Sequence, residues 1–249
     1  MYAFRHTSLS VSAGNVWLDA MLAHAPDVRG IAVLVQNGCI LHADLRDAVI
    51  AKRLQDAHFA TLSVDLLTRY EEQRDVDARY NVPLMSARLD AVLEWLDHQP
   101  GFDRLALALV ASGTACGAAV RSAARNRDRV SALVCRGGRP DLAGAGPLRG
   151  LGCPTQFITG GADAGAPRYQ RAAYELVGSV RDWQSIEQAD SDFRAPGSLD
   201  QAARLTLDWV VEHLPPPKPP EPEAEAEAEA AAASTAAATA RDREPEGDG

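Results

Sequence analysis

The chain has 249 residues, of which 46% are hydrophobic and 24% charged, a composition typical of a soluble globular protein with one sizeable core. Its net charge of −9 is concentrated at one end, because residues 215–249 hold nine acidic and three basic side chains and leave only −3 for residues 1–214. Neither part offers the basic surface that nucleic acids require, so we expect no nucleic-acid partner.

The lengths of the apolar runs and the spacing of the cysteines argue against a membrane segment and a metal site. No apolar run approaches the roughly 20 residues that span a bilayer, and residues 1–14 lack the apolar core of a signal peptide. The four cysteines have no metal-ligand spacing and each lies near an apolar stretch, which is typical of buried thiols in a reducing compartment. We therefore expect a cytoplasmic protein with no membrane contact, no metal and no cofactor. The cysteines are Cys39, Cys116, Cys135 and Cys153.

The first half of the chain begins with two apolar stretches on either side of the turn signal at residues 12–15, which predicts an antiparallel hairpin. A polar excursion at 68–81 is typical of a solvated loop, and in some proteins of part of a lid. The remaining segments alternate between buried strands and helices with an apolar stripe. We predict strands at 31–35 and 59–66 and helices at 45–57 and 84–97.

The second half continues the alternation of strand and helix, which predicts a mostly parallel sheet covered on both faces. Ser198 is a residue type that favours the N-cap of the last helix. The predicted strands are 105–111, 130–135, 153–159 and 183–186, and the predicted helices are 114–124, 167–177 and 199–213.

Residues 215–249 differ in kind from the rest of the chain. Prolines come first, then Glu-Ala repeats, then an alanine-rich run and a charged end, with almost no large apolar side chain. Such a segment cannot bury enough surface to offset its ordering entropy. We predict a folded domain at 1–214 followed by a disordered acidic tail at 215–249, and a protein partner that docks on this tail remains an alternative.

The chain is centred on residues 105–117, LALALVASGTACG, where a buried strand meets a helix through a turn of small residues. A nucleophile elbow, G-x-S-x-G, has this strand-to-helix setting. Ser112 stands at the serine position, but Val110 and Thr114 replace the two glycines. We expect Gly113 to relieve the tight turn by adopting a positive φ. Ser112 then has two interpretations, a nucleophile or a small residue at the start of the helix.

A shifted alignment, residues 113–117, restores both glycines of the motif but places Ala115 at the nucleophile position. In that alignment the turn carries no nucleophile. The choice between the two alignments stays open at the level of the sequence.

Several segments in order resemble the α/β-hydrolases of the dienelactone-hydrolase-like branch over residues 9–214. They are 59–68, the RGGRPDLAG segment 136–144, the GGAD segment 160–163 and 208–214. The resemblance implies an α/β-hydrolase fold, with a mostly parallel sheet, helices on both faces and no large cap domain. It also implies hydrolysis of an ester or lactone by a serine, a histidine and a carboxylate.

The triad that the resemblance implies is incomplete here. The nucleophile position falls on Ser112 and the acid position on Asp163. The base position falls in residues 187–194, which contain no histidine, and Ser191 stands there instead. A serine hydroxyl cannot act as a general base near neutral pH. The only later histidine, His213, is expected at the surface end of the last helix.

The oxyanion loop that the resemblance implies also departs from the family pattern. Its backbone donors fall on Gly38, Cys39 and Gly113, and Asn37-Gly38 replaces the family's His-Gly. His42 follows this loop and is a candidate for an unusual base. The alternative interpretation of His42 is a solvent-facing loop residue.

We therefore predict an α/β-hydrolase-fold protein that has lost hydrolytic activity and binds a small molecule in the cleft or a protein partner through its tail. The alternative is an active hydrolase of small esters or lactones that uses Ser112 and Asp163 with a non-standard base such as His42. A third alternative makes Cys116 or Cys39 the nucleophile, although no histidine of the sequence is placed to activate either thiol.

Overall fold

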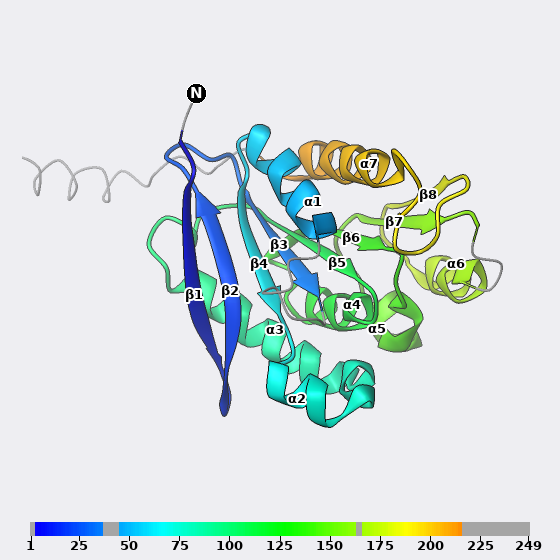
Figure 1. The fold of residues 1–249 in the computed structure, drawn as a ribbon, viewed down its shortest axis with the longest axis horizontal. Coiled ribbons are helices and arrows are strands. Elements are labelled where there is room, and N and C mark those ends of the chain that lie inside the picture. Colours follow the sequence, from blue (N-terminus) through cyan, green and yellow to red (C-terminus); the bar gives the residue numbers. More distant parts are fainter. Residues whose placement is uncertain (1–2, 37–44, 163–165, 216–249) are drawn as a thin grey trace, which may run out of the picture. The chain divides into compact units, whose positions relative to one another are not determined.

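The computed structural model describes residues 3–36, 45–162 and 166–215, which all belong to the unit Met1–Pro217. Its eight strands form one sheet in the order β1-β2-β4-β3-β5-β6-β7-β8 (Figure 1). This arrangement is the α/β-hydrolase fold that the sequence predicts, and the order of elements determines which loops meet at the candidate site.

The N-terminal hairpin consists of β1 (Arg5–Ala13) and β2 (Val16–His24), joined by the turn Gly14-Asn15. Gly14 has a φ of 66°, the conformation that a tight hairpin turn requires of its residues. β2 also pairs antiparallel with β4 (Ala60–Asp65). The predicted hairpin is confirmed, with strands longer than the apolar stretches alone indicate.

The other neighbouring strands run parallel, from β4 across to β8. The middle residues of these strands are mostly buried, as the apolar runs of the sequence require, except in the last strand at the sheet edge, whose middle residues are partly buried or exposed. We call the end where these strands finish the carboxyl edge and the end where they start the amino edge. The strands are β3 (Ile31–Gln36), β5 (Leu107–Ser112), β6 (Val130–Arg136), β7 (Thr155–Gly160) and β8 (Arg181–Ile186).

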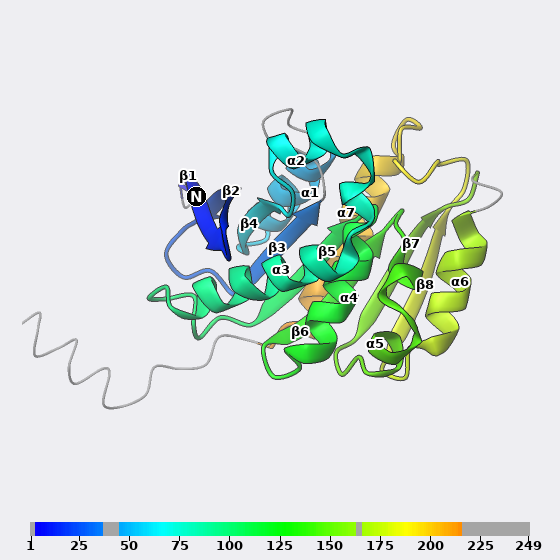
Figure 2. The same cartoon turned by 90° about the horizontal axis from the view of Figure 1, so that it is seen from below.

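Helices cover both faces of the sheet (Figures 1 and 2). α1 (Leu45–Asp56) and α7 (Ser198–His213) pack on one face, where their apolar residues share a core with Val110 and Val134. α3 (Val82–Asp97), α4 (Ala115–Arg125) and α6 (Ala166–Leu176) lie on the other face with Leu109 and Cys135. Alternate residues of each central strand therefore serve two separate cores.

Residues 68–81 are not the solvated loop that the sequence suggests. They form the short helices α2 (Arg69–Arg74) and η2 (Val76–Tyr80), neither of which has a buried residue. Helices without an apolar face give no periodic signal, so the pattern of hydrophobic residues could not reveal them. Two more short helices, η3 (Pro140–Ala143) and α5 (Ala145–Arg149), follow β6 and were also missed.

The start of α7 differs from the prediction as well. The N-cap residue is Gly197, with a φ of 78°, and Ser198 is the first residue of the helix. The Ser198 hydroxyl donates to the Ala195 carbonyl at 2.6 Å and does not cap a helical N–H. The sequence therefore predicts the start of α7 to within one residue, but it assigns the N-cap to Ser198 instead of Gly197.

No helix among the described residues is both long and apolar enough to cross a membrane. The predicted acidic tail from residue 216 onward lies outside the described residues, and its disorder and the domain boundary remain predictions.

Candidate functional site

The candidate site lies at the carboxyl edge, where β5 and β6 end side by side. Ser112 is the last residue of β5, and its partner in the parallel register is Arg136, the last residue of β6. By strand alternation both side chains point to the face that α1 and α7 cover, since Val110 and Val134 lie in that core. Ser112 is half-buried, and within the described residues its hydroxyl makes no hydrogen bond.

The residue at the tip of the strand-to-helix turn is Gly113. It has a φ of 57°, whereas Ser112 is absent from the residues with positive φ. The expected positive φ of Gly113 is therefore confirmed. The strained position of an elbow carries the nucleophile because that conformation holds the side chain out from the turn. Here that position has no side chain, and Ser112 precedes it as an ordinary strand residue.

Close backbone contacts hold this turn in place. The Gly113 carbonyl accepts from the backbone N–H of Arg139 at 2.9 Å. A β-carbon on Gly138 would lie 2.4 Å from the Gly113 oxygen and 2.2 Å from the Cys116 sulfur, so only glycine fits there. The Thr114 hydroxyl donates to the carbonyl of Arg79 in η2, which connects residues 76–80 to the start of α4.

A buried ion pair lies next to Ser112. Arg136 is 3% exposed, and its guanidinium binds the carboxylate of Asp47 in the first turn of α1. Among the residues that the structure describes, the Nε of Arg136 has no hydrogen-bond partner. Sequence analysis could not reveal this pair, because Asp47 and Arg136 are 89 residues apart and no local pattern connects them.

Ser191 lies where the predicted base would stand, in the loop after β8. The loop packs tightly on the ends of two strands, since a β-carbon on Gly137 would lie 1.8 Å from the Ser191 carbonyl oxygen. A β-carbon on Gly160 would likewise lie 2.3 Å from the Asp190 oxygen. Buried Phe193 and an ion pair of 2.8 Å between Arg46 and Asp192 fix the loop further. The loop thus lies over β6 and β7 and brings a serine hydroxyl, not an imidazole.

Three of the described histidines lie beside strand starts. His58 comes just before β4, and its carbonyl accepts from Arg29, just before β3. His24 makes an edge-on ring contact with Phe102, which precedes β5. His6 pairs with Ala23, which in turn pairs with Thr61 near the start of β4.

The two other described histidines end helices at the same edge. His98 is the C-cap of α3, which leads back to the start of β5. His213 ends α7 and packs on Trp209, and the next residue, Leu214, contacts Gly30 just before β3. All five described histidines are therefore at the amino edge, and Ser112 is at the carboxyl edge. This placement confirms that His213 ends a helix, but the expected surface position is wrong, because its side chain is half-buried against Trp209 and its Nε2 is buried.

The described cysteines cluster beneath the turn, inside the core. Cys116, Cys135 and Cys153 are buried free thiols. The hydrogen bond between Cys135 and Cys116, together with burial, raises the pKa of the Cys135 thiol well above its ordinary value. Burial raises the pKa of Cys153 to about 11. Since the thiolate is the nucleophile, thiols in this environment are inert near neutral pH, and Cys116 is shielded by Gly138.

Four other predicted positions fall outside the described residues. They are Asp163 of the implied triad, Gly38 and Cys39 of the implied oxyanion loop, and His42 as the candidate base. Their roles remain predictions. Within the part of the chain that the structure describes, no cluster of histidine, cysteine and carboxylate side chains could hold a metal ion.

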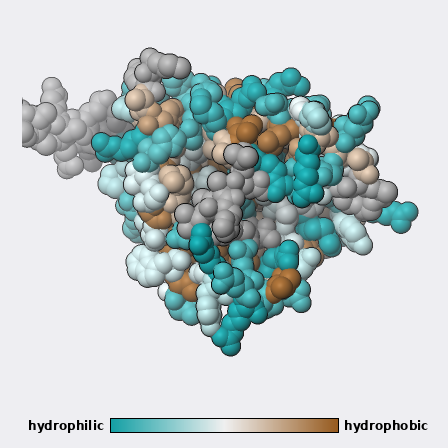
Figure 3. Space-filling view, viewed as in Figure 1, coloured by the Kyte–Doolittle hydropathy of each residue, from teal (hydrophilic) through white to brown (hydrophobic). Residues whose placement is uncertain are grey.

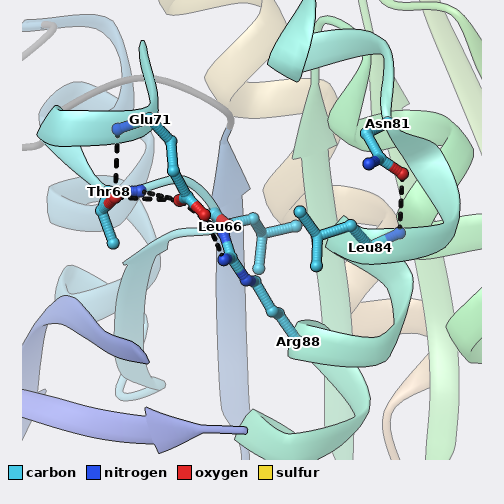
Figure 4. A network of polar contacts seen from close by, with 6 residues as sticks. All are labelled: Leu66, Thr68, Glu71, Asn81, Leu84 and Arg88. Atoms are coloured by element: carbon cyan, nitrogen blue, oxygen red, sulfur yellow. Dashed lines mark hydrogen bonds and ion pairs between the residues drawn. The ribbon is translucent and has the colours of Figure 1, made fainter. Parts of the chain in front are cut away.

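Residues 68–81 are anchored beside the carboxyl edge by a polar network (Figure 4). The Thr68 hydroxyl accepts from the Glu71 N–H, and the Glu71 carboxylate accepts from the Thr68 N–H, a capping box. Arg88 of α3, 4% exposed, binds the Glu71 carboxylate and the Leu66 carbonyl. The Arg88 guanidinium lowers the pKa of Glu71 to about 2. The network fixes α2 between the end of β4 and α3.

No family model matches the chain. A solved dienelactone hydrolase from Anabaena variabilis is 32% identical, with a TM-score of 0.79 over 85% of this chain and 99% of that one. Est1E from Butyrivibrio proteoclasticus, 11% identical, shares the fold, with a TM-score of 0.70 over 82% of this chain and 98% of that one.

A curated relative from Mycobacterium tuberculosis is named "Putative phosphoribosyl transferase" and is 34% identical over 210 residues. The match covers 84% of this chain but 47% of the relative, so the chain spans about half the length of that protein.

Proposed function

The chain belongs to the dienelactone hydrolase family of α/β-hydrolases, and from this premise we propose that it binds a small ligand at the carboxyl edge without hydrolysing esters. The left-handed Gly113 carries this proposal. Acyl transfer needs a side-chain nucleophile at the strained tip of the turn, and a glycine supplies none.

The hydroxyl of Ser112 is a poor substitute for a nucleophile at the tip. It projects from the final residue of a strand toward the face of α1, next to the buried Arg136–Asp47 pair. A hydroxyl also needs a base within hydrogen-bond reach to become reactive. The five described histidines lie at the opposite edge of the sheet.

The size of the expected loss favours binding over catalysis. In subtilisin, removal of the catalytic serine or histidine alone lowers kcat by about 2 × 10⁶. Here the tip residue and the predicted base position are both altered, to Gly113 and Ser191. A family fold without this machinery can hold a ligand without turning it over.

The alternative is an active hydrolase of small esters or lactones. In that mechanism Ser112 attacks the carbonyl, Asp163 orients a base, and His42 is the base. The location of Ser112 at the carboxyl end of β5, in a chain 32% identical to a dienelactone hydrolase, supports this alternative.

The name of the curated relatives gives no transferase activity to this chain, because the match covers less than half of those proteins. The partial match does support the idea that a hydrolase-fold unit of this kind works together with another protein or domain. A protein partner for the acidic residues 215–249 remains part of the proposal.

A fluorophosphonate probe and an activated ester, p-nitrophenyl acetate, separate the two functions. Under the proposal the probe does not label Ser112, and Ser112→Ala leaves the slow ester hydrolysis unchanged. Ser8→Ala, at an exposed serine of β1, is the matched control. Stoichiometric labelling that Ser112→Ala abolishes and Ser8→Ala preserves would overturn the proposal in favour of the active hydrolase.

A further inference from the structure

The sheet has one long unpaired edge. β1 is the outermost strand, paired with β2 along all nine of its residues and with no strand on its other side. The β1–β2 register is continuous from Arg5–His24 to Ala13–Val16, with no bulge. An open edge of this kind presents unpaired N–H and C=O groups that can accept another strand.

The turn of the hairpin determines which residues present these groups. In a hairpin with a two-residue turn, the flanking pair, here Ala13 and Val16, exchanges both backbone hydrogen bonds. Hydrogen-bonded and non-hydrogen-bonded pairs then alternate along the strand. The backbone groups that point away from β2 therefore belong to His6, Ser8, Ser10 and Ser12.

Proteins usually protect such edges with charges, proline, bulges or short strands. The opposite edge strand, β8, is short and begins with Arg181 and Asp182. In contrast, the sequence from residue 6 to residue 18 contains no lysine, arginine, aspartate, glutamate or proline. The first eight residues of β1 are half-buried or exposed except for Val11, so another strand has access to them.

The face of the molecule seen in Figure 3 offers no large continuous apolar area on which a partner could dock. In Figure 3 the hydrophobic residues form separate patches among hydrophilic ones, and most side chains over β1 and β2 are pale, which marks weak polarity. Exposed Trp17 of β2 lies next to Ser12 in the register. Backbone pairing, rather than an apolar face, is therefore the interaction that this edge supports.

We propose that β1 pairs antiparallel with β1 of a second copy of this chain, about a two-fold axis at Leu9. This register pairs His6 with Ser12 and Ser8 with Ser10 of the other copy, and so uses all four residues with outward-facing backbone groups. A two-fold axis at a neighbouring residue leaves at least one of them unpaired. The result is a continuous sheet across both copies.

The charge pattern favours a second copy as the occupant. In the proposed register Arg5 lies opposite Ala13, and no two like charges face each other. Small serine side chains alternate along both strands and leave the backbones free to approach. Pairing of single strands buries a modest area, so we expect a reversible dimer whose fraction rises between about 1 and 100 µM protein.

Sedimentation measurements on the full chain over this concentration range test the dimer. We expect a mass that approaches twice 26.6 kDa. Ser10→Pro removes an outward N–H but no hydrogen bond to β2, so this variant should stay monomeric with an unchanged far-UV circular dichroism spectrum. Ser10→Ala keeps the N–H and should dimerise like the unchanged chain. A monomer at 100 µM, or a dimer that survives Ser10→Pro, overturns the proposal.

A disulfide test is independent of the folding of the proline variant. Residues on the two-fold axis in a non-hydrogen-bonded pair have Cα atoms about 4.5 Å apart, within disulfide range. Leu9→Cys should therefore give a covalent dimer on mild oxidation. Thr7→Cys, on the same face of β1 but four positions from its own copy, should not. Equal cross-linking of the two variants, or none with Leu9→Cys, contradicts the proposed register.

Discussion

The two edges of the parallel sheet contrast in their chemistry. The carboxyl edge holds Ser112, the left-handed Gly113 and the buried Arg136–Asp47 pair. The amino edge holds all five histidines that the structure describes, from His6 to His213. A hydrolase needs the serine and the imidazole at the same edge, within hydrogen-bond reach of each other. In the part of the chain that the structure describes, Ser112 and the histidines therefore lie at opposite edges of the sheet.

The largest expected effect comes from disturbing the loop that covers the carboxyl edge. Gly160→Ala places a β-carbon 2.3 Å from the Asp190 carbonyl oxygen, and backbone cannot yield as a flexible side chain does. We expect a loss of about 3 kcal/mol or more in the free energy of unfolding, measured in urea. Gly146→Ala, where a β-carbon meets nothing within 4 Å, is the control and should be neutral or slightly stabilising.

An effect of similar size concerns the buried ion pair beside Ser112. Asp47→Ala leaves the Arg136 guanidinium charged and unpaired, which we expect to cost about 3–5 kcal/mol of unfolding free energy. Asp56→Ala is the control in the same helix, because its pair with Lys52 is exposed and contributes less than about 1 kcal/mol. The double variant Asp47→Leu/Arg136→Met should recover most of the loss. No recovery would mean that the two residues act independently.

A smaller effect should appear on acidification, through the network that anchors α2. The Arg88 guanidinium holds the pKa of the Glu71 carboxyl at about 2 in the folded chain, below its ordinary value of 4.5. Its contribution is therefore complete above about pH 4.5 and is lost as the pH falls toward 2. Glu71→Gln should therefore reduce the change of melting temperature with pH between pH 2 and 4.5.

Glu72→Gln is the control for the acid profile, because burial raises the pKa of Glu72 and its contribution has the opposite sign. If both variants give the same pH profile as the unchanged chain, the Arg88 contact does not stabilise the fold.

The smallest effect is expected at the amino edge. His213→Ala should leave any slow hydrolysis of p-nitrophenyl acetate unchanged, because Leu214 places the end of α7 beside Gly30, away from Ser112. His42→Ala is the informative comparison. If this change alone abolishes hydrolysis, the alternative function is correct and the contrast between the two edges no longer describes the whole site.

The central strands and the long helices could be predicted from the sequence, because β3 and β5 are nearly continuous apolar runs and α3 has an apolar stripe. The small helices α2 and η2 could not, since they are held by polar contacts to Arg88 and Thr114 and have no buried residue. Sequence spacing offered Ser112 or Ala115 as the tip of the elbow and could not decide between them. The φ of Gly113 agrees with neither alignment, because it places the strained tip one residue after Ser112.

By itself the sequence determined the order of strands and helices, the strand-to-helix turn near Ser112 and the absence of a histidine from residues 187–194, because these depend on local composition and spacing. Only the tertiary structure decided that Gly113 occupies the tip, that Arg136 meets Asp47, and that the described histidines gather at the far edge. The reason is physical: backbone dihedrals at a tight turn and contacts between residues far apart in the chain are set by packing across the sheet, which no local pattern records.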